Sequence, residues 1–368
     1  MNHSGNMLKK EQPDIRNVVR SVLSKYDVDA MLVMNPYNMR YLSGYTGGCG
    51  YLYLSEHKNL ILTDSRYTIQ ANEEATDFSV VEVSGTDGYI NAINALVIEE
   101  KVKKLAFEAR ELSFAEYMKW AEKLNIKNLV PVADDFTNLR QIKKDWELER
   151  LKKAEEIGDL AFEKILNVIQ PGMTELQIAA HLEFFMKEAG AEGLSFDTIV
   201  ASGVNSAMPH AVPTQKKVEP GDFITMDFGC IYQGYCSDMT RTIVVGKASE
   251  EQKKIYRIVK DAQQAALDMI RAGFKGCEID KAARDLIAGQ GYGKCFGHGL
   301  GHSVGLYIHE EPRLSPTCDQ VIQAGMIETV EPGIYIKDFG GVRIEDMVCV
   351  TQDGYMNFAH SDKNLIEL

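Results

Sequence analysis

The sequence predicts a two-domain α/β protein, in which an α/β unit precedes a larger α+β unit of helices and antiparallel hairpins. The chain has 368 residues, which at about 150 residues per domain corresponds to two domains. Hydrophobic residues make up 45% and charged residues 25% of the chain, the ordinary proportions of a globular protein with a sizeable core. Short apolar runs alternate with helical segments as far as Asp134-Asp135, which is the pattern of an α/β unit.

The elements of the first domain follow from short apolar runs and from the turn residues between them. Helices are predicted over residues 15–26, 67–74 and 88–100. Strands are predicted over residues 30–34 and 79–83, and a strand hairpin over residues 51–54 and 60–63. Asn35-Pro36 is expected to close the first strand, and Trp120 is expected at the surface.

A long amphipathic helix over residues 144–169 is expected to open the second domain, because its apolar residues recur at steps of three and four. The domain boundary is placed just before this helix, near Leu139. The sequence therefore predicts one domain over residues 1–139 and another over residues 140–368.

Two further helices of the second domain are marked by capping-box pairs, Thr174 with Gln177 and Ser249 with Gln252. Strands are expected between and after these helices, over residues 223–228, 237–245, 326–331 and 342–350. Helices and hairpins thus come in two successive sets, which indicates an internal duplication of weak sequence identity.

Charge, cysteine content and hydropathy exclude several classes of protein. Lys and Arg number 40 against 53 Asp and Glu, and no dense basic block is present, which argues against a nucleic-acid partner. The seven cysteines are irregularly spaced without a Cys-x-x-Cys pair, as expected for free thiols in a reducing compartment. No apolar run of about 18 residues predicts a membrane span, and the polar N-terminal segment lacks a signal core. We expect a cytoplasmic protein.

Four acidic residues in apolar surroundings are expected to form two facing pairs. A hairpin that turns around Tyr232–Gly234 would bring Asp227 and Asp238 to one face, directly opposed or one diagonal step apart. A second hairpin would place Glu331 opposite Glu345. Like charges that face each other destabilise a sheet, so a divalent cation is the natural compensation. Four carboxylates suit a pair of divalent ions.

Histidines cluster in a glycine-rich stretch that follows the first acidic pair. His298, His302 and His309 are three of the eight histidines and fall within twelve residues, beside glycines that allow close backbone approach. An imidazole that joins carboxylates favours manganese, cobalt, iron or zinc over calcium. His210 is a fourth candidate, on a loop.

Plainer interpretations of the same residues stay open at this point. The four carboxylates could serve as partners of Arg241 and Arg343 in buried ion pairs. His302, taken alone, could be a core histidine with satisfied hydrogen bonds. The facing geometry favours metal ligands over both interpretations.

Five motifs in order carry a family resemblance: Met-Asp-Phe-Gly, Ser-Asp-Met-Thr-Arg-Thr, Gly-His-Gly-Leu-Gly-His, Val-Glu-Pro-Gly-Ile-Tyr and Arg-Ile-Glu-Asp. They resemble the pita-bread metallopeptidases, and the chain is similar to their two-domain branch, the Xaa-Pro aminopeptidases and prolidases, from about Asp14 onward. Asn35-Pro36 and the stretches 41–44 and 62–67 look like the N-terminal domain of that branch. The resemblance implies a creatinase-type α/β domain followed by a pita-bread catalytic domain with internal pseudo-twofold symmetry.

The resemblance also implies a set of metal ligands. Asp227 would bind one metal ion in a bidentate manner, while Asp238 and Glu345 would bridge two ions. His302 and Glu331 would complete the coordination of the second ion, and Glu331 would also shuttle the proton. Two divalent ions are implied, Mn²⁺ first, with Co²⁺, Zn²⁺ or Fe²⁺ as alternatives.

Five further positions match residues that line the family's substrate site. His210, His298 and His309 would act beside the substrate, where His298 and His309 could stabilise an oxyanion. Arg343 and Tyr335 would bind substrate.

The function implied by the resemblance is metal-dependent hydrolysis of the Xaa-Pro bond, which releases the N-terminal residue of a proline-containing peptide. An Xaa-Pro aminopeptidase is favoured over a prolidase restricted to dipeptides. A methionine aminopeptidase, a creatinase-type amidinohydrolase and a non-catalytic binding homologue remain alternatives. A homodimer is expected, because the family is commonly dimeric.

Overall fold

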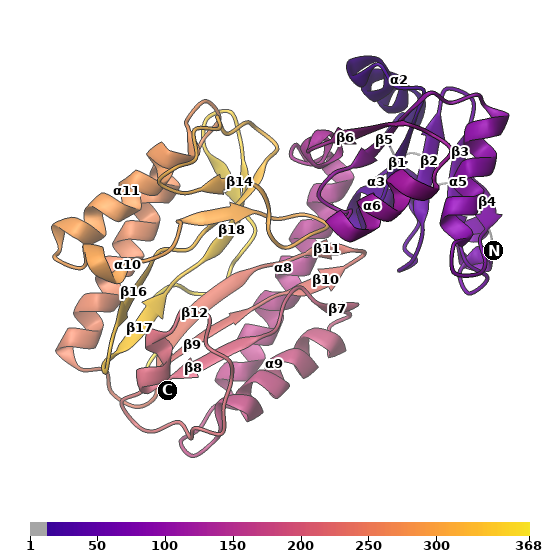
Figure 1. Cartoon of the computed structure of the whole chain (residues 1–368). Coiled ribbons are helices and arrows are strands. Elements are labelled where there is room, and N and C mark those ends of the chain that lie inside the picture. The colour runs from indigo at the N-terminus through magenta and orange to yellow at the C-terminus, as the bar shows by residue number, and fades with distance from the viewer. Residues whose placement is uncertain (1–12) are drawn as a thin grey trace. The chain divides into compact units, whose positions relative to one another are not determined.

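The computed structural model describes residues 13–368. Residues 1–12, which make up most of the polar N-terminal segment of the predicted first domain, lie outside the described residues. The chain divides into two compact units, residues 1–140 and 141–368 (Figure 1). This division falls one residue from the boundary expected at Leu139.

The first unit is built on a six-stranded mixed sheet with strand order β4-β3-β2-β1-β5-β6. Strands β1, β2 and β3 pair antiparallel and the other neighbours pair parallel. The strands are β1 Ala30–Val33, β2 Tyr51–Ser55, β3 Asn59–Thr63, β4 Ser79–Glu82, β5 Lys104–Glu108 and β6 Asn128–Val132. The helices are α2 Ile15–Tyr26, α3 Pro36–Ser43, α4 Thr68–Glu74, α5 Gly88–Glu99, α6 Phe114–Lys123 and α7 Asp135–Leu139.

Asn35-Pro36 closes the first strand as expected, since β1 ends at Val33. It also begins α3, a helix not predicted from the sequence: the Asn35 side chain accepts hydrogen bonds from the first-turn N–H groups, and proline fits the first helical position. The expectation that Trp120 lies at the surface is wrong. Trp120 is buried, with 2% of its surface exposed, in a core that α5 and α6 form with the sheet. Phe114 and Met118 of the same helix are exposed, so the apolar residues of α6 do not mark a single buried face in the sequence.

The second unit consists of two similar halves, each with two helices packed on antiparallel strands. The first half has α8 Asp145–Leu166, α9 Glu175–Glu188, β7 Gly193–Leu194, β8 Ile199–Ser202, β9 Phe223–Phe228, β10 Cys230–Tyr232, β11 Tyr235–Cys236 and β12 Met239–Val244. The second half has α10 Glu250–Met269, α11 Gly276–Gly289, β13 Gly301–Ser303, β14 Glu310–Leu314, β15 Ile327–Val330, β16 Gly333–Ile336, β17 Gly340–Arg343, β18 Asp346–Val350 and β19 Tyr355–Asn357. Figure 1 shows α8 beside α9 and α10 beside α11. The expected duplicated pita-bread arrangement is confirmed.

Local signals start the helices where the sequence predicts. The capping boxes at Thr174 and Ser249 are both formed, each with a reciprocal glutamine bond.

No helix among residues 13–368 is both long and apolar enough to cross a membrane.

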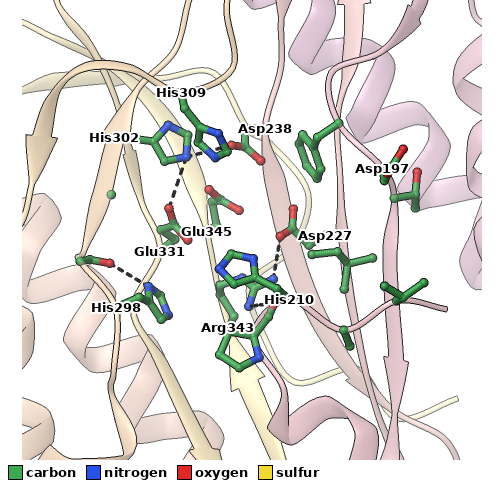
Figure 2. A pocket seen from close by; sticks show the side chains of 18 of the residues that line it. Asp197, His210, Asp227, Asp238, His298, His302, His309, Glu331, Arg343 and Glu345 are labelled. Atoms are coloured by element: carbon green, nitrogen blue, oxygen red, sulfur yellow. Dashed lines mark hydrogen bonds and ion pairs between the residues drawn. The ribbon is translucent and has the colours of Figure 1, made fainter. Parts of the chain in front are cut away.

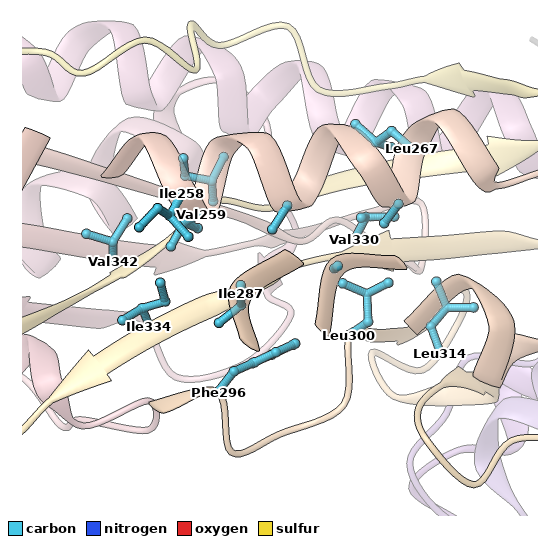
Figure 3. Close-up of a cluster of buried hydrophobic side chains, with 14 of the residues drawn as sticks. Ile258, Val259, Leu267, Ile287, Phe296, Leu300, Leu314, Val330, Ile334 and Val342 are labelled. Carbon is cyan, nitrogen blue, oxygen red and sulfur yellow. The ribbon is translucent and has the colours of Figure 1, made fainter. Parts of the chain in front are cut away.

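Each half of the second unit has its own hydrophobic cluster beneath its helices. In the second half, Ile258 and Val259 of α10 and Ile287 of α11 meet apolar side chains of the strands, Val330 and Val342 among them (Figure 3). This core supports the hairpins that carry the acidic residues described below.

Replacement of Ile287 by Ala should destabilise the second unit by about 2–5 kcal/mol, because the fully buried side chain leaves a cavity. Urea unfolding followed by circular dichroism measures this loss. Leu160→Ala is the control, since that side chain on α8 is 46% exposed and its loss should cost less than about 0.5 kcal/mol. Equal effects of the two substitutions would contradict the assignment of this core.

Candidate metal centre

The first acidic pair lies on the hairpin formed by β9 and β12. Asp227 pairs with Thr240 in this antiparallel register. Asp238 comes two residues before Thr240, so it lies one diagonal step from Asp227 on the same face. Asp238 is buried, and its backbone N–H donates to Glu155 of α8 at 3.2 Å.

The second acidic pair lies where the second hairpin is interrupted between two pairs of strands. Val330 pairs with Asp346 on one side of the interruption, and Gly333 pairs with Arg343 on the other, in the same register. Glu331 therefore faces Glu345 across the gap, as the sequence predicts. The backbone N–H groups of Glu331 and Glu345 donate instead to the carbonyls of Leu300 and Thr240, at 2.8 and 3.1 Å.

The imidazole of His302 connects the two acidic pairs. Its Nε2 lies 3.4 Å from Asp238 Oδ2 and 3.5 Å from Glu331 Oε1 (Figure 2). Asp238, His302 and Glu345 each offer a ligand atom within 4.8 Å of the others, the one such group found among residues 13–368. The structure thus brings four of the five predicted ligands around one point.

Negative charge on these buried carboxyl groups, and positive charge on the imidazole, is energetically unfavourable. Burial and the neighbouring carboxylates raise the pKa of Asp238 and of Glu345 well above the usual range. Burial raises the pKa of Glu331 to about 8. Burial also lowers the pKa of His302 to about 3, so this imidazole is neutral at pH 7. These shifts all express the cost of placing charge in a dry site without a counter-ion.

The tautomer of His302 follows from its second nitrogen. Nδ1 lies 3.1 Å from the backbone oxygen of Ser303, which can only accept, so Nδ1 carries the proton. The Nε2 lone pair then points toward the carboxyl groups of Asp238 and Glu331, at distances longer than a direct hydrogen bond. A divalent cation between them satisfies all three groups, and mixed N and O donors suit Mn²⁺, Co²⁺, Fe²⁺ or Zn²⁺.

Asp227 is held differently from the other four predicted ligands. Arg343 Nη2 lies 2.6 Å from Asp227 Oδ2, while Oδ1 is buried without a hydrogen-bond partner among the described residues. The ion pair with Arg343 is the plainer alternative, and it accounts for one oxygen only. Arg241 pairs instead with Asp346 at 2.8 Å. The orphaned Oδ1 is the atom of Asp227 that fits a metal ion.

Three of the predicted substrate-side residues form a hydrogen-bonded chain. Arg343 Nη1 donates to Tyr335 Oη at 2.8 Å, and Tyr335 Oη donates to His298 Nε2 at 2.9 Å. The Nδ1–H of His298 donates to the Gly299 carbonyl at 2.8 Å. Burial and Arg343 lower the pKa of His298 to about 4, which keeps this ring neutral. The ring of His309 packs edge-on against that of His302, with centroids 4.6 Å apart.

A cavity of about 790 Å³ opens onto the acidic residues and is lined by all the predicted site residues except Tyr335. His210 reaches it from the loop after β8. Asp197 and Arg313 also line this cavity, although no motif in the sequence marks them. Asp197 precedes β8 and Arg313 lies on β14, so only the folded topology brings them to the site (Asp197 is labelled in Figure 2).

A buried set of carboxylates and one imidazole, at the base of a cavity and mounted on the hairpins of two similar halves, defines a metal-dependent hydrolase. Family comparisons identify the particular kind. Residues 149–352 match the model of "Metallopeptidase family M24", and residues 16–142 match that of "Creatinase/Prolidase N-terminal domain". The chain belongs to metallopeptidase family M24, in its branch with a creatinase-type N-terminal domain, and is a metallopeptidase.

Individual relatives are similar over almost the whole chain. The Xaa-Pro dipeptidase of Pyrococcus horikoshii is 39% identical over 345 residues, which cover 94% of this chain and 96% of the relative. A solved Xaa-Pro dipeptidase from Bacillus anthracis is 42% identical, with a TM-score of 0.92 and coverage of 96% and 99% of the two chains. An X-Pro aminopeptidase from Thermotoga maritima is 39% identical, with a TM-score of 0.87 and coverage of 95% and 100%.

Without metal, the protein should lose stability as pH rises from about 6.5 to 8. The folded pKa of Glu331, about 8, exceeds the ordinary value of 4.5, so the folded state binds more protons than the unfolded state in this window. Histidines with lowered pKa act in the opposite sense, but only below their ordinary value of 6.5.

Thermal unfolding in a chelating buffer at several pH values measures this dependence. Added Mn²⁺ should raise the melting temperature and flatten the decline, because the cation takes the place of the protons. A melting temperature that stays constant or rises across this window in the chelator would contradict the charge distribution described here.

Proposed function

We propose that the protein hydrolyses the peptide bond before proline with the help of two divalent metal ions. The observation that carries this proposal is the convergence of His302 Nε2 with Asp238 Oδ2 and Glu331 Oε1, at 3.4 and 3.5 Å. These distances exceed the roughly 2.7–3.2 Å of a direct hydrogen bond and suit groups that share a cation. Membership of family M24 supports the reaction class. The printed names of the Pyrococcus and Bacillus relatives support the Xaa-Pro specificity.

The proposed ligands are Asp227, Asp238, His302, Glu331 and Glu345, with Mn²⁺ as the first choice of metal. Divalent ions bound there would supply Lewis-acid activation of the scissile carbonyl and of the attacking water. Glu331 would take up a proton and return it to the departing proline nitrogen.

The remaining site residues would bind and orient the peptide. Both ring nitrogens of His298 have partners, Gly299 and Tyr335, so this neutral ring would line the peptide site without adding charge. His309 and His210 would act on the side of the cavity nearer the acidic residues. We assign this chemistry to residues 140–368, and a homodimer and a cytoplasmic location stay predictions.

Xaa-Pro dipeptides are our first choice of substrate, which reverses the preference drawn from the sequence. Arg313 lines the cavity as a 39% exposed cation, and a dipeptide places a free carboxylate one residue from the scissile bond. Guanidinium groups bind carboxylates through two parallel hydrogen bonds.

An Xaa-Pro aminopeptidase is the second candidate, favoured by the likeness to the Thermotoga maritima enzyme. A non-catalytic homologue is disfavoured, because all five ligand positions are present.

Replacement of Glu331 by Gln should lower kcat for an Xaa-Pro dipeptide by at least about 1000-fold, because the proton shuttle is lost. Steady-state assays with Mn²⁺ measure this loss, and metal analysis separates it from weakened metal binding. Glu219→Gln, at an exposed loop position, is the control and should keep full activity. Retained activity in the Glu331 variant would reject its role.

A competition between Leu-Pro and Leu-Pro-Gly should show that the dipeptide is consumed and the tripeptide is spared. Chromatography follows both peptides with manganese-loaded protein. Arg313→Met should raise KM for Leu-Pro about tenfold, through loss of a charged hydrogen bond, and leave KM for Leu-Pro-amide unchanged.

Other outcomes of this competition discriminate between the candidates. Preferential loss of the tripeptide would make the protein an Xaa-Pro aminopeptidase. If metal is bound and neither peptide is cleaved, the Xaa-Pro function is rejected.

A further inference from the structure

Two loops carry histidines to the cavity, and each loop is tied to a buried acidic residue on the second helix of its half. We propose that Glu175 of α9 and Asp280 of α11 are positioning residues, which hold His210 and His298, respectively, in place for the reaction. This inference rests on the roles given to the two histidines in the proposed function.

Glu175 ties together both ends of the loop that carries His210. It is the first residue of α9, and its side chain is fully buried. Oε1 accepts from the N–H and hydroxyl of Ser202 at 2.7 and 2.8 Å, and from Asn205 at 3.0 Å. Oε2 accepts from the N–H and hydroxyl of Thr214 at 3.0 and 2.6 Å. One carboxylate therefore closes the loop over 202–214.

All of these partners donate hydrogen bonds to Glu175, so a side chain at this position must offer two acceptor oxygens, as a carboxylate does. A glutamine amide would turn N–H groups toward the donors of Ser202 or Thr214, and one end of the loop would lose its tie. The loop lies between β8 and β9. Arg343 Nη1 also donates a hydrogen bond to the backbone oxygen of Pro209 in this loop, at 3.3 Å. His210 itself is exposed, so its position depends on the backbone.

Asp280 acts on the second loop directly and through Arg284, one helical turn further along α11. Asp280 Oδ1 accepts from the N–H of Leu300 at 3.0 Å. Both oxygens of Asp280 bind the Arg284 guanidinium, at 2.7 and 2.8 Å. Arg284 in turn donates to the carbonyl of His298 at 2.7 Å and to that of Phe296 at 3.1 Å.

These bonds clamp the backbone on both sides of His298. Gly297 and Gly299 flank that histidine, and neither has a side chain that could pack and fix the loop. The guanidinium of Arg284 also lies 4.2 Å from the centre of the Phe296 ring, which adds a cation–π contact. The backbone of this loop is thus held by α11, in addition to the side-chain bond between His298 and Tyr335.

Double-mutant cycles test the proposal, because positioning predicts a specific pattern of coupling. Glu175→Gln should lower kcat/KM for Leu-Pro by about 100-fold, and by less than about twofold when His210 is already Ala. Asp280→Asn should behave in the same way with His298→Ala. The crossed pairs, Glu175→Gln with His298→Ala and Asp280→Asn with His210→Ala, should be additive.

Matched controls and second variants keep the test decisive. Glu188→Gln on α9 and Asp285→Asn on α11 change half-exposed or exposed acidic side chains and should leave kcat/KM unchanged. If an acidic variant does not fold, Thr214→Val and Arg284→Met remove single ties of the two loops and should show the same coupling. Bound metal, measured on each variant, should equal that of the parent protein.

Three results would overturn the inference. If all four cycles are additive, the acidic residues only stabilise the fold, and the proposed function is untouched. If the losses follow a loss of metal, the acidic residues act on the metal centre and not on the loops. If His210→Ala and His298→Ala leave kcat/KM unchanged, the proposed roles of the histidines fail, and this inference fails with them.

Discussion

The repulsion among buried carboxylates is the constraint on which the rest of the structure depends. Asp238, Glu331 and Glu345 meet around a neutral His302, and burial raises the pKa of each acid. Such an arrangement destabilises the folded chain unless a cation occupies it. The two hydrophobic clusters beneath the hairpins offset that cost and keep the donors from moving apart.

The duplicated architecture explains how these acidic residues are held close together although their burial is unfavourable. Each half contributes one hairpin with one acidic pair, and hairpins fix side-chain spacing through their register. Behind each hairpin stand two helices, and the second of these reaches a histidine-bearing loop through a buried acid, Glu175 or Asp280. The hairpins thus carry the proposed metal ligands, while the loops carry the histidines that we propose to meet the substrate.

Much of this structure could be predicted from the sequence because its signals are local. Capping pairs such as Thr174 with Gln177 mark helix starts, and hairpin register follows from the apolar pattern, so the facing of Glu331 and Glu345 could be foreseen. The burial of Trp120 and the entry of Arg313 into the cavity could not. Each of these depends on segments that are distant in the chain and meet only in the folded protein.

The most direct test of this account is a crystal structure of the manganese-loaded protein with anomalous scattering recorded for the metal. We predict two anomalous peaks between the carboxylates of Asp238 and Glu345, with Nε2 of His302 coordinated to one ion and Asp227 to the other. No peak at that position, or a peak bound by other residues, would contradict the claim that these facing carboxylates form a metal centre.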